Sequence, residues 1–278
     1  MKSDIVNAFS IDFEDWYQGL EIIDMKNWHN YESRIERNCN GCLEILAKYN
    51  VKATFFVLGY LAENYPKLIR DIASAGHEVG SHGYSHTQIF RLTPEKFNQE
   101  LIRTNDSIAA ACGKKPIGFR APIFSVLAAS HWSFDLLSEN GFIYDSSINP
   151  TLNYRYGYIR ADRFKHEIIT NSGARIIEIP VTSARIFGLN FPVGGGAYFR
   201  FWPYFFTRWA FNKVNKNGKP GVFYMHPWEI DPEQPRINLP FRLSATHYHR
   251  LDSTKSLLES LLSDFKFSTM ASVFGIEY

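Results

Sequence analysis

The sequence has few cysteines, little net charge and no long apolar run, and each shortage narrows the class of protein. Its 278 residues include three cysteines and carry a formal net charge of +2. Three cysteines fit a reducing compartment, and the near-neutral charge argues against a nucleic-acid partner. No window approaches the ~20 apolar residues of a membrane span, and the first residues lack the apolar stretch of a signal peptide. We therefore expect a protein of the cytoplasm or of the inner membrane surface.

The chain does have a regular alternation of short strand-like runs and amphipathic helical patterns. Strands that alternate with helices indicate parallel βαβ units, and a single α/β barrel commonly takes about 250 residues. We therefore predict an α/β fold, a (β/α) barrel formed by one domain over residues 1–278. The predicted strands are residues 6–13, 53–57, 77–81, 117–119, 142–144, 176–179 and 222–225, and the predicted helices are 39–49, 66–76, 93–112, 130–140 and 252–265.

Residues 150–219 interrupt this alternation. They contain a glycine-rich turn at 192–196 (PVGGG) and then an aromatic run at 198–209 (YFRFWPYFFTRW). We predict that the segment is an insertion that caps the barrel mouth. Its aromatic rings could stack on sugars, could place residues 198–211 in peripheral contact with a membrane, or could simply pack on the barrel.

Five polar residues lie at or just past the C-terminal ends of strand-like runs. In a β/α barrel these ends converge on one mouth, where active sites are built. The shared placement therefore predicts a single site. The five residues are Asp12, His82, Arg120, Asp145 and His226. His247 and His249, which alternate near the C-terminus, could also reach the mouth.

A pair of histidines indicates a metal site. His82 and His86 are four residues apart, a spacing that can place both imidazoles on one face of a helical turn. The acidic residues of the run at 12–15 (DFED) supply the carboxylate that the pair lacks. Two imidazoles and one carboxylate leave an open position for water, which is the composition of a catalytic zinc site. We therefore predict a divalent metal, with zinc as the first candidate.

Four further runs resemble the motifs of the polysaccharide deacetylase family, which contains the NodB homology domain of carbohydrate esterase family 4. Residues 81–86 (SHGYSH) are similar to its histidine motif and residues 118–122 (GFRAP) to its R-x-P motif. Residues 144–150 (YDSSINP) resemble its D-x-S segment, and residues 223–229 (FYMHPWE) resemble its late histidine motif. The opening D-x-E-D-W and the glycine-rich insertion resemble the branch associated with exopolysaccharide and surface-glycan loci.

The resemblance implies a distorted (β/α) barrel and metal-dependent removal of N-acetyl groups from sugars. It implies that Asp12 is the general base and that Arg120 orients it. It also implies that His226 is the general acid and that Asp145 orients His226. These residue types suit the reaction, because a carboxylate can deprotonate water and an imidazolium can protonate the departing amine.

The first motif departs from the family pattern T-F-D-D, in which base and ligand are adjacent. Strand alternation puts Asp12 and Glu14 on one face, which favours Asp12 as base and Glu14 as ligand. Aligning residues 13–15 (FED) with F-D-D instead makes Glu14 the base and Asp15 the ligand. A third possibility is that one of these carboxylates is only a salt-bridge partner. The carboxylate ligand stays open between Glu14 and Asp15.

The residues and the resemblance together predict a metal-dependent hydrolase acting on an acylated amino sugar. Its substrate would be a bacterial surface polysaccharide or a lipid-linked glycan precursor. Two alternatives use the same fold: an N-deformylase or other non-peptide C–N hydrolase, and a non-catalytic glycan-binding protein. The sequence leaves the oligomeric state undetermined.

Overall fold

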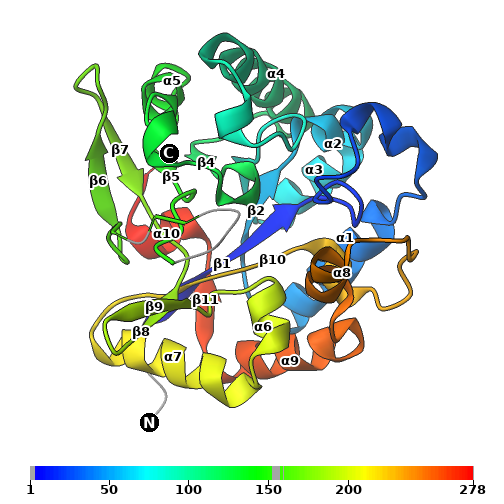
Figure 1. Cartoon of the computed structure of the whole chain (residues 1–278), viewed down its shortest axis with the longest axis vertical. Helices are drawn as coiled ribbons and strands as arrows, with labels where there is room; N and C mark the ends of the chain where they lie inside the picture. Colours follow the sequence, from blue (N-terminus) through cyan, green and yellow to red (C-terminus); the bar gives the residue numbers. More distant parts are fainter. Residues whose placement is uncertain (1–3, 152–156, 159, 278) are drawn as a thin grey trace.

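A nine-stranded sheet runs through the molecule (Figure 1). The structure is a computed structural model that describes residues 4–151, 157–158 and 160–277. Along the sheet the strand order is β10-β1-β2-β3-β4-β5-β7-β6, and β11 also pairs with β1. The strands of this sheet are β1 (Val6–Phe13), β2 (Thr54–Val57), β3 (Glu78–Ser81), β4 (Gly118–Phe119), β5 (Tyr144–Asp145), β6 (His166–Ile169), β7 (Arg175–Glu178), β10 (Val222–Met225) and β11 (Lys266–Ser268).

Strand β1 pairs with three other strands, β2, β10 and β11. Seven of its eight residues are buried, as expected for a parallel strand covered on both faces. It pairs in parallel with β10, where Ala8 faces Val222, and with β2, where Ser10 faces Thr54. The other pairs along the main path are parallel as well, except for β6 with β7. The predicted α/β fold is therefore confirmed.

The sheet stays open between β10 at one end and the β7–β6 pair at the other. In the part of the chain that the structure describes, no strand pair closes it into a barrel. Irregular backbone fills this seam instead: Thr182 donates to the Val222 carbonyl, and Tyr224 donates to the Gly194 carbonyl. Gly195 has a φ of +138°, and a Cβ at this position would lie 1.8 Å from the Tyr224 carbonyl oxygen. Glycine is therefore required where this segment crosses β10.

Helices cover the outside of the sheet (Figure 1). The longest, α4, begins and ends as the sequence predicts: the Thr93 hydroxyl accepts a hydrogen bond from the Lys96 amide, and Gly113 follows the helix in the left-handed conformation. The helices are α1 (Ile35–Lys48), α2 (Gly59–Asn64), α3 (Pro66–Ser74), α4 (Pro94–Cys112), α5 (Ser133–Glu139), α6 (Ala197–Phe201), α7 (Tyr204–Lys216), α8 (Phe241–Tyr248), α9 (Leu251–Asp264) and α10 (Met270–Phe274).

The segment 150–219, predicted to be a capping insertion, contributes to several parts of the molecule. Residues 152–156 and 159 lie outside the described residues. Strands β6 and β7 belong to the main sheet, while β8 (Ser183–Ile186) and β9 (Leu189–Pro192) form a separate hairpin. Helices α6 and α7 follow that hairpin. The limits of the insertion remain a prediction.

No helix in the described part of the chain is both long enough and apolar enough to cross a membrane.

Candidate active site

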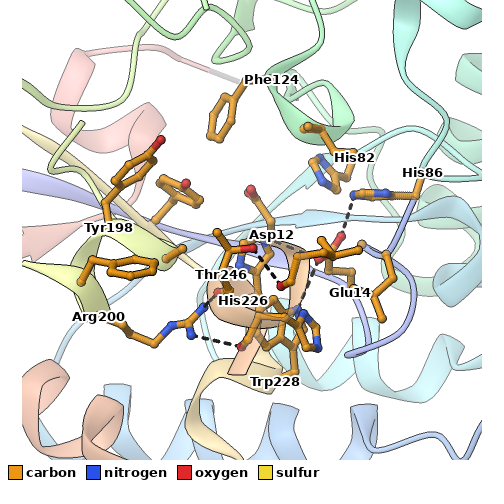
Figure 2. Close-up of a pocket in the computed structure, with 18 residues that line it drawn as sticks. Asp12, Glu14, His82, His86, Phe124, Tyr198, Arg200, His226, Trp228 and Thr246 are labelled. Carbon is orange, nitrogen blue, oxygen red and sulfur yellow. Dashed lines mark hydrogen bonds and ion pairs between the residues drawn. The ribbon is translucent and has the colours of Figure 1, made fainter. Parts of the chain in front are cut away.

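A cavity of about 200 Å³ opens at the C-terminal ends of β1, β3 and β10. The side chains of Glu14, His82 and His86 lie together on one side, with Asp12 and His226 beside them (Figure 2). The strand-end residues that line the cavity come from segments far apart in sequence. Aromatic side chains form much of the remaining wall, namely Phe124, Tyr198, Phe201, Tyr224 and Trp228.

Glu14, His82 and His86 form a donor set that could hold a metal ion. One possible ligand atom from each residue lies within 4.8 Å of the others. The His82 Nδ1 lies 2.7 Å from the Arg120 carbonyl oxygen. Because a carbonyl can only accept, Nδ1 carries the proton and Nε2 keeps its lone pair for a ligand.

The two histidines reach this position from a loop. The sequence indicated a helical turn, but residues 82–88 after β3 have no helical structure. Gly83 has a φ of +73° and His86 a φ of +57°, so the chain twice enters the left-handed region. These turns bring the two imidazole centroids to 5.4 Å, with the His86 Nε2 2.7 Å from the Glu14 Oε2.

The surroundings of Glu14 fit a cation. Its carboxylate is 2% exposed, and its Oε2 contacts the His86 Nε2 at 2.7 Å. Burial raises the pKa of Glu14, but the charges of His86 and His226 outweigh it and lower the pKa well below its usual range. Burial also lowers the pKa of His82 to about 4, which keeps that imidazole neutral. A buried carboxylate beside two imidazoles is a donor set that suits a divalent metal.

Asp15 faces away from the cavity. Its carboxylate accepts hydrogen bonds from the Ser33 hydroxyl (2.7 Å) and from the amides of Arg34 and Trp16 (2.9 Å each). These contacts tie the loop after β1 to the start of α1. Of the two carboxylates that the sequence left open, the structure therefore groups Glu14, and not Asp15, with the histidines.

Asp12 is held by a buried arginine. The Arg120 Nη1 lies 2.7 Å from the Asp12 Oδ1 and also donates to the Ser10 hydroxyl at 2.8 Å. The other guanidinium nitrogens bond the Ser146 carbonyl and hydroxyl, and the guanidinium lies over the Phe56 ring at 4.3 Å. Arg120 is fully buried, so its fixed fork holds the Asp12 carboxylate in one orientation.

The carboxylate that contacts His226 is Glu229. Its Oε1 lies 2.7 Å from the His226 Nδ1 and also accepts from the His226 amide at 3.0 Å. Burial lowers the pKa of His226, but Glu14 and Glu229 raise it to about 9. The imidazole is therefore positively charged at neutral pH, with Nε2 3.7 Å from the Glu14 Oε1.

Asp145, predicted to orient His226, has other partners. Its Oδ1 accepts from the Ser147 hydroxyl at 2.5 Å, and its Oδ2 accepts from the Ser147 amide at 3.1 Å. Burial raises the pKa of Asp145. Burial also raises the pKa of the neighbouring Glu178 carboxyl group, and the charge of Asp145 raises that pKa further. The end of β5 therefore faces β7, and Asp145 forms a buried carboxyl pair there instead of contacting His226.

A second buried arginine supports the His226 side of the cavity. The Arg200 Nε lies 2.8 Å from the Glu229 Oε2. Its Nη atoms donate to the carbonyls of Thr246, His247 and His249 at the end of α8, at distances of 2.7–3.1 Å. Arg200 therefore links α6 and α8 to the carboxylate that holds His226.

Sequence reasoning assigned no role at the site to three residues of this region, Glu229, Arg200 and Trp228. It also did not foresee that His247 stacks on Trp228. The Trp228 indole donates to the Glu14 Oε1 at 3.3 Å and lies between the rings of His226 and His247, with centroids 5.1 and 4.3 Å away. Glu229 had a local signal, because it follows His226 by three residues. Arg200 had none, because its partners are 29 to 49 residues away.

Comparison with known proteins identifies the family. Residues 24–135 match the family described as polysaccharide deacetylase. This match places residues 24–135 in the polysaccharide deacetylase family. Residues 146–275 match a domain of unknown function, DUF3473.

Curated relatives match part of the chain. The peptidoglycan-N-acetylglucosamine deacetylase of Bacillus cereus is 30% identical over 122 residues, which cover 40% of this chain and 44% of the relative. The peptidoglycan deacetylase of Helicobacter pylori is 35% identical over 106 residues, 38% of this chain and 35% of the relative. The matched region therefore spans less than half the length of these relatives.

A solved structure matches nearly the whole fold. The crystal structure of a polysaccharide deacetylase, described as putative, from Mycobacterium smegmatis has a TM-score of 0.64 and 20% sequence identity. The match covers 98% of this chain and 91% of that one. At this identity the likeness supports the fold.

Proposed function

We propose that this protein is a divalent-metal-dependent hydrolase that removes the N-acetyl group, or a related N-acyl group, from an amino sugar. The single observation that carries the proposal is the cavity in which Glu14, His82 and His86 lie beside Asp12 and His226. A donor set, a carboxylate base and a charged imidazole within one cavity are the groups that amide hydrolysis needs. The names of the Bacillus and Helicobacter relatives support a glycan substrate.

Glu14, His82 and His86 would hold the metal, and their mixture of imidazole and carboxylate donors favours zinc. When bound there, the metal supplies a Lewis acid that polarises the acyl carbonyl and makes water more acidic. Trp228 and the Arg120 carbonyl fix the orientation of Glu14 and His82 through the hydrogen bonds described above.

The remaining groups divide the proton transfers between them. Asp12, oriented by Arg120, accepts a proton from the water that attacks the acyl carbon. His226 donates a proton to the amine nitrogen as the C–N bond breaks, so the products are a carboxylate and a free amino sugar. Glu229 holds the His226 Nδ1, so that Nε2 is left for this transfer. Glu229 thus takes the positioning role that the sequence assigned to Asp145.

The proposed substrate is a bacterial surface glycan or its lipid-linked precursor, processed at the inner membrane surface. Helix α7 presents exposed aromatic rings, with Phe205 72% and Trp209 41% exposed. Arg208 and Lys213 lie on the same helix, and aromatic rings mixed with cations suit a membrane interface. Flotation with anionic vesicles at low salt tests this contact through residues 198–211, and an unbound protein would contradict it.

Acetate release from a panel of N-acetylated amino sugars tests the proposed activity. Purified protein should release acetate, should lose activity with a chelator and should regain it with zinc. His226→Ala should lower kcat by at least about 100-fold, while His131→Ala, at an exposed histidine away from the cavity, should not. Formate release without acetate release would favour the deformylase alternative. Glycan binding without hydrolysis by the zinc-loaded protein would favour a binding protein.

A further inference from the structure

The chain between the two histidines of the candidate site has a constrained backbone. Residues 83–85 separate His82 from His86. His86 has a φ of +57°, in the left-handed region that residues other than glycine seldom adopt. In this conformation the His86 Nε2 lies 2.7 Å from the Glu14 Oε2 (Figure 2). Such a backbone conformation persists only where the surrounding structure holds it, so the contacts of residues 83–85 decide where the His86 imidazole points.

Glu100 on α4 binds the amides of this segment. Its Oε2 accepts hydrogen bonds from the Tyr84 amide at 3.2 Å and from the Ser85 amide at 3.4 Å, and its Oε1 accepts from the Ser85 hydroxyl. Among the described residues, the hydrogen bonds of the Glu100 carboxylate go to this segment alone. A carboxylate that accepts from two adjacent amides fixes the path of the chain immediately before His86.

Helix α2 binds the carbonyls of the same segment. The Gly83 carbonyl accepts from the Gly59 amide at 2.8 Å. The Tyr84 carbonyl accepts from the Tyr60 amide at 3.3 Å, and the Tyr84 hydroxyl donates to the Glu63 carboxylate at 2.7 Å. Helices α2 and α4 pack together (Figure 1). The two helices therefore form one support, in which α2 holds the carbonyls of the segment and α4 holds its amides.

His86 depends on this support more than the other proposed ligands do. The His82 Nδ1 contacts the Arg120 carbonyl, and the Glu14 carboxylate accepts from the Trp228 indole. Among the described residues, the His86 imidazole has one polar contact, and it is the Glu14 carboxylate that would bind the same metal. The direction of the His86 imidazole is therefore set by its backbone.

We infer that Glu100 is a positioning residue of the proposed metal site: it holds residues 84–85 so that the His86 imidazole points toward Glu14. The inference rests on the proposed function, because it takes Glu14, His82 and His86 as ligands of a divalent metal. Glu100 lies outside the set of described residues that line the cavity, so it acts through the backbone and not on the substrate.

Zinc affinity, measured by competition with a chelator, tests the role of Glu100. Glu100→Ala should weaken zinc binding by about 10–100-fold, the usual effect of losing a residue that orients a ligand. Glu100→Gln keeps a carbonyl oxygen for the two amides and an NH₂ group that donates to the Ser85 hydroxyl, so it should retain most of the affinity. Unchanged affinity in Glu100→Ala would overturn the inference and leave the proposed metal site standing. Absence of zinc binding in the wild type would contradict the proposed function together with the inference.

Two control variants separate positioning from loss of stability. Asn98→Ala, two residues earlier on α4, removes a hydrogen bond of 2.7 Å with Asn140 and leaves residues 84–85 untouched. It should lower the free energy of unfolding without changing zinc affinity. Glu44→Ala, at an exposed glutamate of α1, should change neither. Equal losses of zinc affinity in Asn98→Ala and Glu100→Ala would show that the effect comes from stability and would overturn the inference.

Hydrogen exchange tests the contacts of Glu100 without any metal. In the metal-free wild type, the Tyr84 and Ser85 amides should exchange slowly, because both donate to Glu100. In metal-free Glu100→Ala they should exchange about tenfold faster, as expected from the loss of one hydrogen bond, while the amides of β1 keep their rates. Fast exchange of both amides in the wild type, or unchanged rates in Glu100→Ala, would overturn the inference whether or not the protein binds zinc.

Discussion

The two sides of the candidate site are built differently. Glu14, His82 and His86 come from loops that directly follow β1 and β3, the two strands on either side of β2. His226 instead depends on Glu229, which is held by Arg200 on α6, and Arg200 in turn binds the end of α8. The first side needs only strand ends and two turns, whereas the second needs buried charges brought together from three helical segments.

The two sides of the site also come from different parts of the chain. The family match over residues 24–135 includes the two histidines, and the DUF3473 match over 146–275 includes His226, Glu229 and Arg200. Asp12 and Glu14 precede both matches. A complete site therefore requires strand β1 together with segments from both halves of the chain.

Removal of a proposed metal ligand should have the largest effect. That effect should be limited to the side of the site formed by Glu14, His82 and His86. His82→Ala should weaken zinc binding by more than about 100-fold, because loss of a supporting residue alone typically costs 10–100-fold. Calorimetric zinc titration and metal content of the purified protein measure this, with His131→Ala as control. A variant that retained one zinc per chain would show that His82 is not a ligand.

Breaking the buried charge network should instead reduce stability. Arg200→Leu removes one of the two cationic partners of the buried Glu229 carboxylate, so the free energy of unfolding should fall by about 3–5 kcal/mol. Arg208→Leu breaks an ion pair with Asp264 whose arginine is largely exposed, and should cost at most about 1 kcal/mol. Urea unfolding compares the two variants. Equal losses of unfolding free energy would show that the Arg200 network stabilises the fold no more than an exposed ion pair does.

A single methyl group should disturb the ligand side of the site. A Cβ at Gly19 would lie 2.5 Å from the Glu14 Oε1, so Gly19→Ala must displace that carboxylate. Zinc affinity should fall about tenfold, as for other changes next to a ligand. Gly41→Ala, where the nearest atom is the flexible end of Ile230 at 3.2 Å, provides the control. Unchanged zinc affinity in Gly19→Ala would argue against Glu14 as a ligand.

Glu178 and Glu229 are both buried, but their partners differ in charge. Glu229 contacts Arg200 and His226, whereas Glu178 lies beside another carboxyl group, that of Asp145. Burial, and then Asp145 on β5, raises the pKa of Glu178 well above its usual value. The charged and titratable groups that face it are Asp145, Arg120 and the β6 register partner His166. Because the folded pKa is raised, the stabilisation is present at low pH and is lost as the pH rises through that folded pKa.

Glu178→Gln should therefore gain stability relative to the wild type as the pH rises above the pKa of an unfolded glutamate. The gain should be about 1.4 kcal/mol for each pH unit up to the folded pKa. Urea unfolding of both proteins at a series of pH values measures it, and Glu167→Gln, an exposed change on β6, is the control. A pH-independent difference would show that Glu178 is ionised in the folded state.

Local sequence was sufficient for the elements whose signals are local. The Thr93 cap and Gly113 defined α4, and the apolar runs defined β1 and β10, because capping and burial depend on neighbouring residues. The short β6, β8 and β9 and the helices α6 and α8 were not predicted. Their residues are partly exposed and their pattern is broken by aromatic side chains, so periodicity carries little information there.

The sequence by itself determined which chemical groups the site contains and that they follow strands. It also placed Asp12 and Glu14 on one face, because side chains alternate along a strand. Only the tertiary structure decided how these groups are paired. Asp15 accepts a hydrogen bond at the start of α1, Asp145 pairs with Glu178, and His226 pairs with Glu229. Such pairings depend on which strand and helix ends meet in space, and the spacing of residues along the chain does not contain that information.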